Sequence, residues 1–233
     1  MGVVLEYKKV CKNFGEKQVL EDINLKIKSN KIVGLLGKNG SGKSTLFKLT
    51  NDLLTLSSGE ILIDGNPVSV ESKKIVSYLP ERTYFDSSMK VVDAINMFET
   101  FYEDFDKIKA EKLLEELKLD KNMRFSKMSK GMKEKVQLVL VMSRNAKIYI
   151  LDEPLGGVDP ASRDYILKTI LKNFNKDATL FISTHMIADI EKILDEVVII
   201  DDGKILLHED AEKLRKKENA SIDEIFRRKF YVY

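Results

Sequence analysis

The residues that most constrain the fold of this chain form a glycine-rich loop, GKNGSGKST, at positions 37–45. The apolar run 32–36 comes directly before this loop, and a helix-like stretch that starts near Lys43 follows it. Glycine permits backbone conformations that other residues avoid, so successive N–H groups of the loop can point at phosphate oxygens. The helix adds its unpaired N–H groups and the positive end of its dipole. The pattern therefore predicts a strand, a phosphate-cradling loop and a helix.

The polar side chains of the loop indicate a nucleoside triphosphate bound with a metal ion. We expect Lys43 to reach the β- and γ-phosphates and the Ser44 hydroxyl to ligate Mg²⁺. The residues expected to bind the phosphates are Gly37, Lys38, Asn39, Gly40, Ser41, Gly42, Lys43, Ser44 and Thr45.

A second element carries two carboxylates. Residues 148–151 are apolar, and Asp152 and Glu153 follow them. A parallel strand delivers the residues at its end to the carboxyl edge of the sheet, where the phosphate loop also lies. We expect Asp152 to hold Mg²⁺ through water and Glu153 to face the attacking water. Acidic pairs after apolar strands are common in α/β folds, so the upstream phosphate loop gives this pair its interpretation.

The rest of the chain alternates between strand-like and helix-like patterns, which predicts an α/β fold. The expected strands lie at 3–10, 23–27, 32–36, 61–63, 75–79, 147–151, 179–183, 196–200 and 204–207. The expected helices run from Lys43 to about Asp52, across 87–120, after Gly131, near 161–173, near 187–194 and through the tail at 210–230. The aromatic residues Phe98, Phe101, Tyr102 and Phe105 form either a core stripe or a docking surface, and we expect core.

Composition narrows the class of protein. The 39 basic and 37 acidic residues leave a net charge of +2, so no nucleic-acid partner is expected. The single Cys11 excludes an intramolecular disulfide, and with only two histidines it cannot build a metal site. No window approaches the roughly 20 apolar residues of a membrane span, and the N-terminal stretch lacks a signal-peptide pattern. We therefore expect a cytoplasmic chain.

A third motif, Met128-Ser129-Lys130-Gly131-Met132, stands between these two elements and before a helix-like segment. Ser129 is a good N-cap and Gly131 permits close approach to a ligand, although a generic cap explains both equally well in isolation. The order is more specific: phosphate loop, helical insert, Ser-x-Gly motif, then the Asp–Glu strand. In this order the chain resembles the ATP-binding subunit of an ABC transporter over essentially its full length.

The resemblance assigns motifs to the chain residue by residue. Residues 37–45 match the Walker A loop and 148–153 match Walker B. Phe14 falls where the family has an aromatic residue that stacks on adenine, and Glu81 takes the position of the Q-loop. Residues 128–132 match the signature motif, which implies nucleotide contacts from Ser129, Lys130 and Gly131.

The remaining motifs imply the catalytic residues. Gly157, Val158 and Asp159 match the D-loop, and His185 matches the switch histidine. The implied roles are Glu153 as general base, His185 as a γ-phosphate contact that orients Glu153, and Lys43 as a stabiliser of phosphate charge. Asp159 is implied to help align an opposing site, and Ser44, Glu81 and Asp152 to hold the metal.

Four positions depart from the family pattern. Met132 replaces the Gln that ends the usual signature sequence LSGGQ. Glu81 replaces the common Gln, which adds negative charge near the metal and can alter coupling to a membrane partner. Lys130 replaces a Gly of the signature motif and brings a cation near phosphate. Phe14 in place of Tyr keeps the stacking face.

The resemblance also implies an architecture and partners. A single ABC-type P-loop NTPase domain, 1–233, is expected to combine a RecA-like core with an antiparallel β subdomain, a helical subdomain inserted at about 85–145 and a helical tail at 208–233. ATP and Mg²⁺ are the implied cofactors. Two copies, or one copy and a paralogous ATPase subunit, would pair head to tail around two ATP molecules. A separate integral membrane permease would hold the chain peripherally at the inner face of the cell membrane, with a docking surface on the helical subdomain.

Two other functions stay open. The first is a soluble ABC ATPase that acts on ribosomes or DNA, but such chains generally carry two nucleotide domains or a long coiled coil between the Walker motifs. The second is a regulatory module without turnover, which the presence of both Glu153 and His185 disfavours. The YLPE and SKGM sequences loosely resemble exporter-type members, including antibiotic-resistance ATPases.

Overall fold

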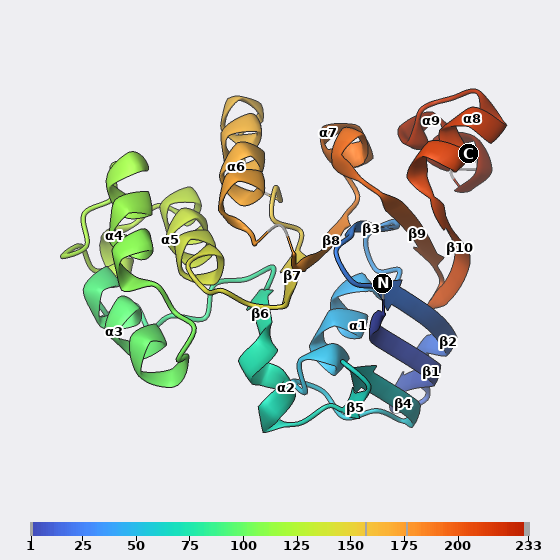
Figure 1. Ribbon diagram of the computed structural model, residues 1–233, viewed down its shortest axis with the longest axis horizontal. Coiled ribbons are helices and arrows are strands. Elements are labelled where there is room, and N and C mark those ends of the chain that lie inside the picture. Colours follow the sequence, from blue (N-terminus) through green and yellow to red (C-terminus); the bar gives the residue numbers. More distant parts are fainter. Residues whose placement is uncertain (1, 157, 176, 231–233) are drawn as a thin grey trace.

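The computed structural model describes residues 2–156, 158–175 and 177–230, and Figure 1 shows their arrangement. The strands of this part of the chain form a four-stranded sheet in the order β2-β1-β4-β5 and a six-stranded sheet in the order β10-β9-β3-β8-β7-β6. The strand bounds are β1 Val3–Phe14, β2 Lys17–Lys28, β3 Ile32–Leu36, β4 Ser58–Ile63, β5 Asn66–Pro67, β6 Val76–Leu79, β7 Ile148–Asp152, β8 Thr179–Thr184, β9 Glu196–Asp201 and β10 Lys204–Asp210.

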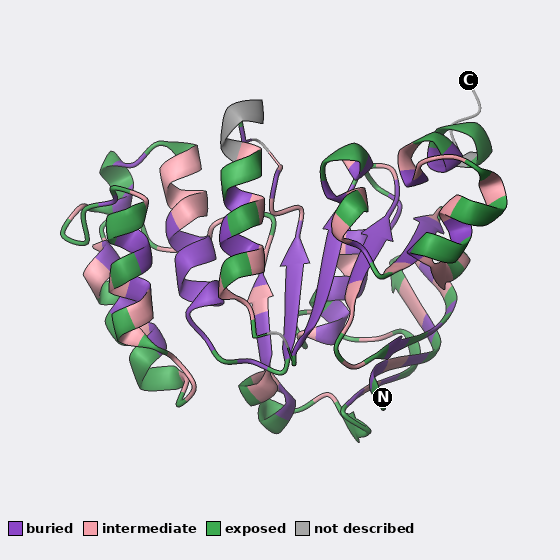
Figure 2. Ribbon diagram, turned by 45° about the horizontal axis from the view of Figure 1, so that its top comes forward, coloured by how far each residue is buried: buried purple, intermediate pink, exposed green. Residues whose placement is uncertain are grey.

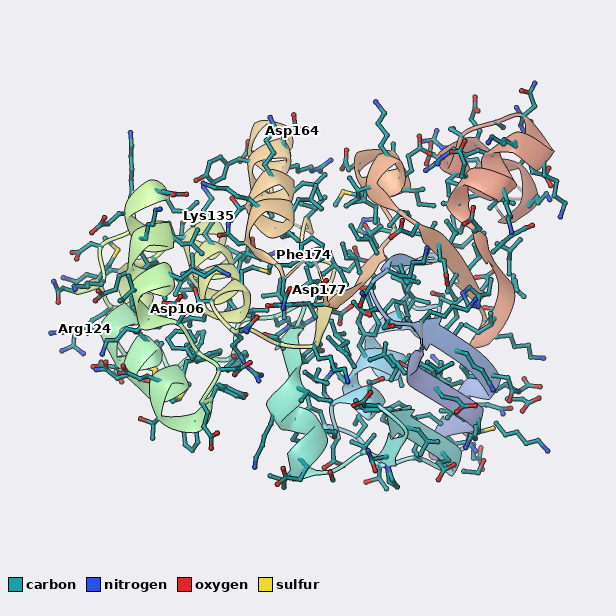
Figure 3. The ribbon with its side chains drawn as sticks, in the orientation of Figure 1. Asp106, Arg124, Lys135, Asp164, Phe174 and Asp177 are labelled. Atoms are coloured by element: carbon teal, nitrogen blue, oxygen red, sulfur yellow. The ribbon has the colours of Figure 1, made fainter. Side chains whose placement is uncertain are left out.

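Helices connect most of the strands and cover the larger sheet. Their bounds are α1 Lys43–Thr50, α2 Val70–Ile75, α3 Val91–Phe101, α4 Lys107–Glu116, α5 Lys130–Met142, α6 Pro160–Asn173, α7 Ile187–Ile190, α8 Ala211–Glu218 and α9 Ile222–Phe230. Side-chain caps fix several of the N-termini. Asp106, for example, accepts a hydrogen bond from the Lys109 backbone N–H at 2.8 Å at the start of α4 (Figure 3).

The inner strands of the six-stranded sheet are buried on both faces, as the continuous apolar run at 148–151 predicts. All five residues of β7 and all six of β8 are buried, and both strands appear purple along their length in Figure 2. Successive side chains of β7 alternate between two cores. Tyr149 and Leu151 pack on one face, and Ile148 and Ile150 pack on the other.

Different layers cover the two faces. Apolar residues of α6 to α9 and of the C-terminal half of α5 form one core with the sheet. Apolar residues of β1, β2, β4 and α1 form the other core, so the antiparallel sheet packs against the larger one. The N-terminus of α1 thus lies between the two sheets, beside the end of β3.

Helices α3, α4 and α5 build a third core of their own, next to the β6 edge of the larger sheet (Figure 1). Arg144 connects this helical group to the sheet through its side-chain contacts. Its guanidinium is buried, pairs with Asp104 at 2.9 Å and lies 3.8 Å from the centre of the Tyr102 ring. It also donates to the backbone carbonyls of Lys73, Lys74 and Val76.

The four aromatic residues that were expected to be core differ in burial in the structure. Phe98 is buried, and Tyr102 and Phe105 pack partly against the third core. The expectation is wrong for Phe101, which is the last residue of α3 and is 74% exposed.

Several elements differ from the predicted pattern. The short helix α2 was not expected, because no apolar repeat marks it; a capping box between Ser69 and Ser72 starts it instead. The expected helix at 187–194 is shorter, since α7 ends at Ile190 and a 3₁₀ turn covers Glu191–Ile193. In the tail, β10 continues to Asp210 before α8 and α9 follow.

Candidate functional site

The phosphate loop connects β3 to α1 in a conformation that depends on its glycines. Gly42 is the N-cap of α1 with φ 108°, and Gly40 has φ 83°. A Cβ on Gly37 would lie 2.3 Å from the carbonyl oxygen of Ile200, so that position has no room for a side chain. The loop therefore adopts the strand–loop–helix arrangement that its sequence predicts.

A pocket of about 710 Å³ opens over this loop. Its lining joins the loop to the ends of β7 and β8 and to two hairpin turns that are distant in sequence. The lining residues are Phe14, Lys17, Gln18, Val19, Asn39, Gly40, Gly42, Lys43, Ser44, Thr45, Glu81, Glu153, His185, Asp202 and Gly203. The structure thus brings Phe14, Glu81, Glu153 and His185 to the same pocket as the phosphate loop.

Lys43 is held inside the loop. Its ammonium donates to the carbonyl oxygens of Gly37 at 2.8 Å and Lys38 at 3.0 Å, and it lies 3.2 Å from Glu153 Oε1. Both charged side chains are less than a tenth exposed. A phosphate that contacts Lys43 must therefore compete with a buried carboxylate.

Asp152 lies at the end of β7, fully buried. Its Oδ1 accepts hydrogen bonds from Ser183 Oγ at 2.6 Å and Ser44 Oγ at 3.1 Å. Burial raises the pKa of this carboxyl above its ordinary value, the two hydroxyl donors oppose that rise, and the nearby Glu153 and Glu81 carboxylates add to it. Oδ2 has no hydrogen-bond partner among the residues that the structure describes. A bound cation would favour the ionised form of Asp152 and would give Oδ2 a partner.

Glu153 connects Lys43 to His185. Its Oε2 lies 2.9 Å from His185 Nδ1, and its Oε1 faces Lys43. Its backbone has φ 50°, a left-handed conformation that is uncommon for glutamate and turns the chain sharply after β7. The N–H of Glu153 donates to the Ser183 hydroxyl at 3.0 Å.

The pocket lining also includes an aromatic side chain. The Phe14 ring is 48% exposed, and the ammonium of Lys12 lies 4.8 Å from its centre. The turn Asp202–Gly203, which also lines the pocket, closes the β9–β10 hairpin. Gly203 donates to the Ser41 carbonyl at 3.1 Å and accepts from the Glu21 N–H at 2.9 Å, which locks the turn between β2 and the phosphate loop.

The sequence predicts the strands at 196–200 and 204–207 but not that the turn between them lines the pocket, and it assigns no role to Lys17, Gln18 or Ser183. The Asp-Gly pair at 202–203 is a recognisable turn signal, but no local pattern indicates that the turn packs on a loop 160 positions earlier. Ser183 carries no motif of its own. Its position is set by register, since it is the residue of β8 that pairs with Asp152.

The signature residues do not line the pocket. Ser129 caps α5 by accepting from the Met132 N–H at 3.3 Å, Lys130 is exposed and lies 3.7 Å from Glu134, and the space around Gly131 is open. Asp159 is exposed, in the loop before α6, and Gly157 lies outside the described residues.

Three other loop residues also stay outside the pocket lining. Gly37 and Lys38 contribute their carbonyl groups to Lys43, and the buried Ser41 contributes its carbonyl to Gly203.

No group of three or more His, Cys, Asp or Glu side chains forms a metal cage anywhere in the described ranges. None of the helices traced there is long and apolar enough to cross a membrane.

Comparisons with known proteins agree on one family. The family model described as ABC transporter matches residues 20–156. The bacitracin transport ATP-binding protein BcrA of Enterococcus faecalis is 30% identical over 93% of this chain and 72% of its own length. The lipopolysaccharide export system ATP-binding protein LptB of Haemophilus influenzae is 27% identical over 93% of this chain and 95% of its own length. A solved structure titled as an ATP-binding subunit of an ABC transporter superposes with a TM-score of 0.85, at 27% identity, over 96% of this chain and 98% of that one.

Proposed function

Because the chain belongs to the ABC transporter family of ATP-binding ATPases, we propose that it hydrolyses ATP to power transport through a separate membrane protein. One observation carries the proposal. Lys43, Ser44, Glu153 and His185 line one pocket, and the buried Asp152 accepts a hydrogen bond from Ser44 beside it. These residues come from three separate strand ends. This set combines phosphate binding, metal binding and a base, which are the parts that phosphoryl transfer to water needs.

The residues fit a Mg²⁺ ion that arrives with the triphosphate. Mg²⁺ prefers oxygen ligands and is usually held by one or two carboxylates together with substrate phosphates. Ser44 and Asp152 would hold it here, and Glu81 would support them from the pocket rim. When bound, the ion supplies positive charge against the β- and γ-phosphate oxygens.

The protein side chains then act on the phosphate and the water. Lys43 moves from Glu153 to the γ-phosphate and neutralises its charge. Glu153, released from that ion pair, accepts a proton from the attacking water as general base. His185 keeps Glu153 oriented through the 2.9 Å contact and reaches the γ-phosphate with its other ring nitrogen. The Phe14 ring stacks on the adenine.

Phosphate release by the purified protein tests this proposal. Wild type should hydrolyse ATP in the presence of Mg²⁺. We expect Glu153→Gln to keep ATP binding, since it removes the carboxylate that competes for Lys43, and to lose at least about 100-fold in kcat because the base is gone. Lys43→Ala should lose binding or turnover. A fully active Glu153→Gln variant would contradict the assignment of the base.

Transport requires a partner, and we propose that this partner docks at the junction between the helical group and the larger sheet. A groove of about 420 Å³ lies there, with Leu53, Tyr84, Phe98 and Tyr102 among its lining residues. Phe101 and Tyr102 line a smaller hollow beside it. BcrA and LptB serve chemically unlike cargoes by their names, bacitracin and lipopolysaccharide. We therefore place the choice of cargo in the membrane partner.

We also propose that two copies close on two ATP molecules, with Ser129, Lys130 and Gly131 of one copy against the phosphates bound by the other. In support, these residues form the exposed N-terminus of the 13-residue helix α5 and stand apart from the pocket of their own chain. Asp159, also exposed, would contact the opposing site.

A further inference from the structure

Ser183 contacts both Asp152 and Glu153 and does not line the pocket itself. It is fully buried in β8, where it pairs in register with Asp152 of β7. Its hydroxyl donates to Asp152 Oδ1 at 2.6 Å and accepts from the Glu153 N–H at 3.0 Å. One hydroxyl therefore contacts the side chain of one functional residue and the backbone of the next.

The first contact fixes the direction of the Asp152 carboxylate. Oδ1 receives two donors, Ser183 at 2.6 Å and Ser44 at 3.1 Å, and Oδ2 receives none among the described residues. With Oδ1 committed to two hydroxyls, the rotation of the carboxylate is set. Oδ2 is left for the metal-bound water that the proposed function requires. Without Ser183, only the Ser44 hydroxyl would hold this orientation, and Ser44 is itself a proposed metal ligand.

The second contact fixes the turn at Glu153. A glutamate at φ 50° is held in a conformation that its surroundings must enforce. Its N–H is shared between the hydroxyl of Ser183 and the carbonyl oxygen of the same residue, at 3.0 and 3.2 Å. The turn determines where the side chain begins, and hence whether it reaches both Lys43 and His185.

We infer that Ser183 is a positioning residue for ATP hydrolysis, whose hydroxyl couples the orientation of the metal-holding Asp152 to the backbone turn that aims Glu153. The inference rests on the proposed function. Ser183 does not line the pocket, so its loss should change the response to Mg²⁺ and the rate of the chemical step rather than the capture of ATP.

The test combines hydrolysis kinetics with binding of a nonhydrolysable ATP analogue measured by calorimetry, each with and without Mg²⁺. Ser183→Ala is expected to lower kcat about 10- to 100-fold, the range for a hydrogen bond to a charged group, with KM within about threefold. The gain in analogue affinity that Mg²⁺ produces should shrink about tenfold, while affinity without Mg²⁺ stays within twofold.

Two further variants separate the hydroxyl from packing. Ser183→Thr keeps the hydroxyl and should restore most of kcat and of the Mg²⁺ response. Ser183→Val has the same shape as threonine without the hydroxyl and should resemble Ser183→Ala. If the added methyl prevents both from folding, Ser183→Cys replaces them and should give a kcat between those of Ser183→Ala and wild type, because a thiol is a weak donor.

Thr179→Val is the matched control. Thr179 is buried at the opposite end of the same strand, and its hydroxyl accepts from the Asn30 N–H at 3.1 Å and donates to the Lys28 carbonyl. Thr179→Val removes two hydroxyl hydrogen bonds from β8, as Ser183→Ala does, but at the end of the strand away from the pocket. The kcat and the Mg²⁺ response should therefore stay at wild-type values.

The inference is overturned if Ser183→Ala keeps wild-type kcat and Mg²⁺ response, if Ser183→Val equals Ser183→Thr, or if Ser183→Cys is no better than Ser183→Ala. Failure of the proposed function looks different, because in that case the wild-type protein itself releases no phosphate.

Discussion

A single residue, Gly203, holds the β9–β10 turn against the phosphate loop and so helps to form the nucleotide pocket. It has φ 72°, and a Cβ there would lie 2.3 Å from the carbonyl oxygen of Val19. Its backbone also bonds to Ser41 of the phosphate loop and to Glu21 of β2. The residue therefore has both a conformational and a steric reason to be glycine.

We expect Gly203→Ala to lower the free energy of unfolding by about 2–4 kcal/mol, since it combines a positive φ with a backbone clash. ATP affinity should fall as well, because the shifted turn moves the wall facing Phe14. Gly65→Ala is the matched control, with φ 80° and no heavy atom of the described chain in contact with its added Cβ. It should lose only about 1 kcal/mol. Equal losses in denaturant unfolding would mean that the clash at Gly203 is relieved without cost.

At the scale of elements, the helical group presents apolar side chains to solvent beside the groove of the larger sheet. Phe101 is 74% exposed at the end of α3, next to the groove, and Ile108 is 81% exposed on α4, away from both hollows. Both side chains are similarly exposed, but only Phe101 lies next to the groove. They therefore test whether the groove region is where a membrane partner binds.

Phe101→Asp should detach the protein from membranes that contain its partner, because a carboxylate would be buried in the interface, while phosphate release in solution stays unchanged. Ile108→Asp should remain attached. Co-sedimentation of each variant with membranes of the producing cell measures this. Phe101→Asp protein that pellets as wild type does would remove the groove region as the docking site.

Sequence patterns predicted most elements, but they did so for unequal reasons. The strand before Asp152 was predictable because a parallel strand buried on both faces must be apolar throughout. Helix α2 was not, because its start depends on a reciprocal Ser69–Ser72 cap rather than on an apolar repeat. The phosphate loop and the acidic pair were found because their chemistry is local. Gly203 and Ser183 were missed because tertiary packing and strand register, respectively, bring them to the site.

For the whole molecule, the pairing of two copies that we propose depends on residues outside the pocket. The N-terminus of α5 carries Ser129, Lys130 and Gly131 outside the pocket, with open space at Gly131. A helix N-terminus and a cation next to it attract phosphate. A second copy, placed head to tail, would supply that phosphate twice by symmetry.

Light scattering of Glu153→Gln should therefore show a dimer with ATP and Mg²⁺ and a monomer with ADP. Adding Gly131→Asp should abolish this dimer, since the new carboxylate would face the incoming phosphate. The same change should not harm the monomer, because an acidic residue in the first turn of a helix is favourable. Exclusively monomeric Glu153→Gln under these conditions would refute the paired arrangement.

The hydrogen bonds that Gly203 makes to the phosphate loop and to β2 have a consequence for folding during synthesis. The β1–β2 and β9–β10 hairpins both line the pocket, so it is complete only after these distant segments of the chain have packed together. A ligand that binds only the native state raises the free energy of unfolding by about 2.7 kcal/mol when its concentration is a hundred times its Kd. Cellular nucleotide can thus stabilise the complete pocket of a newly made chain only after β9 and β10 have left the ribosome and their turn has packed against the phosphate loop.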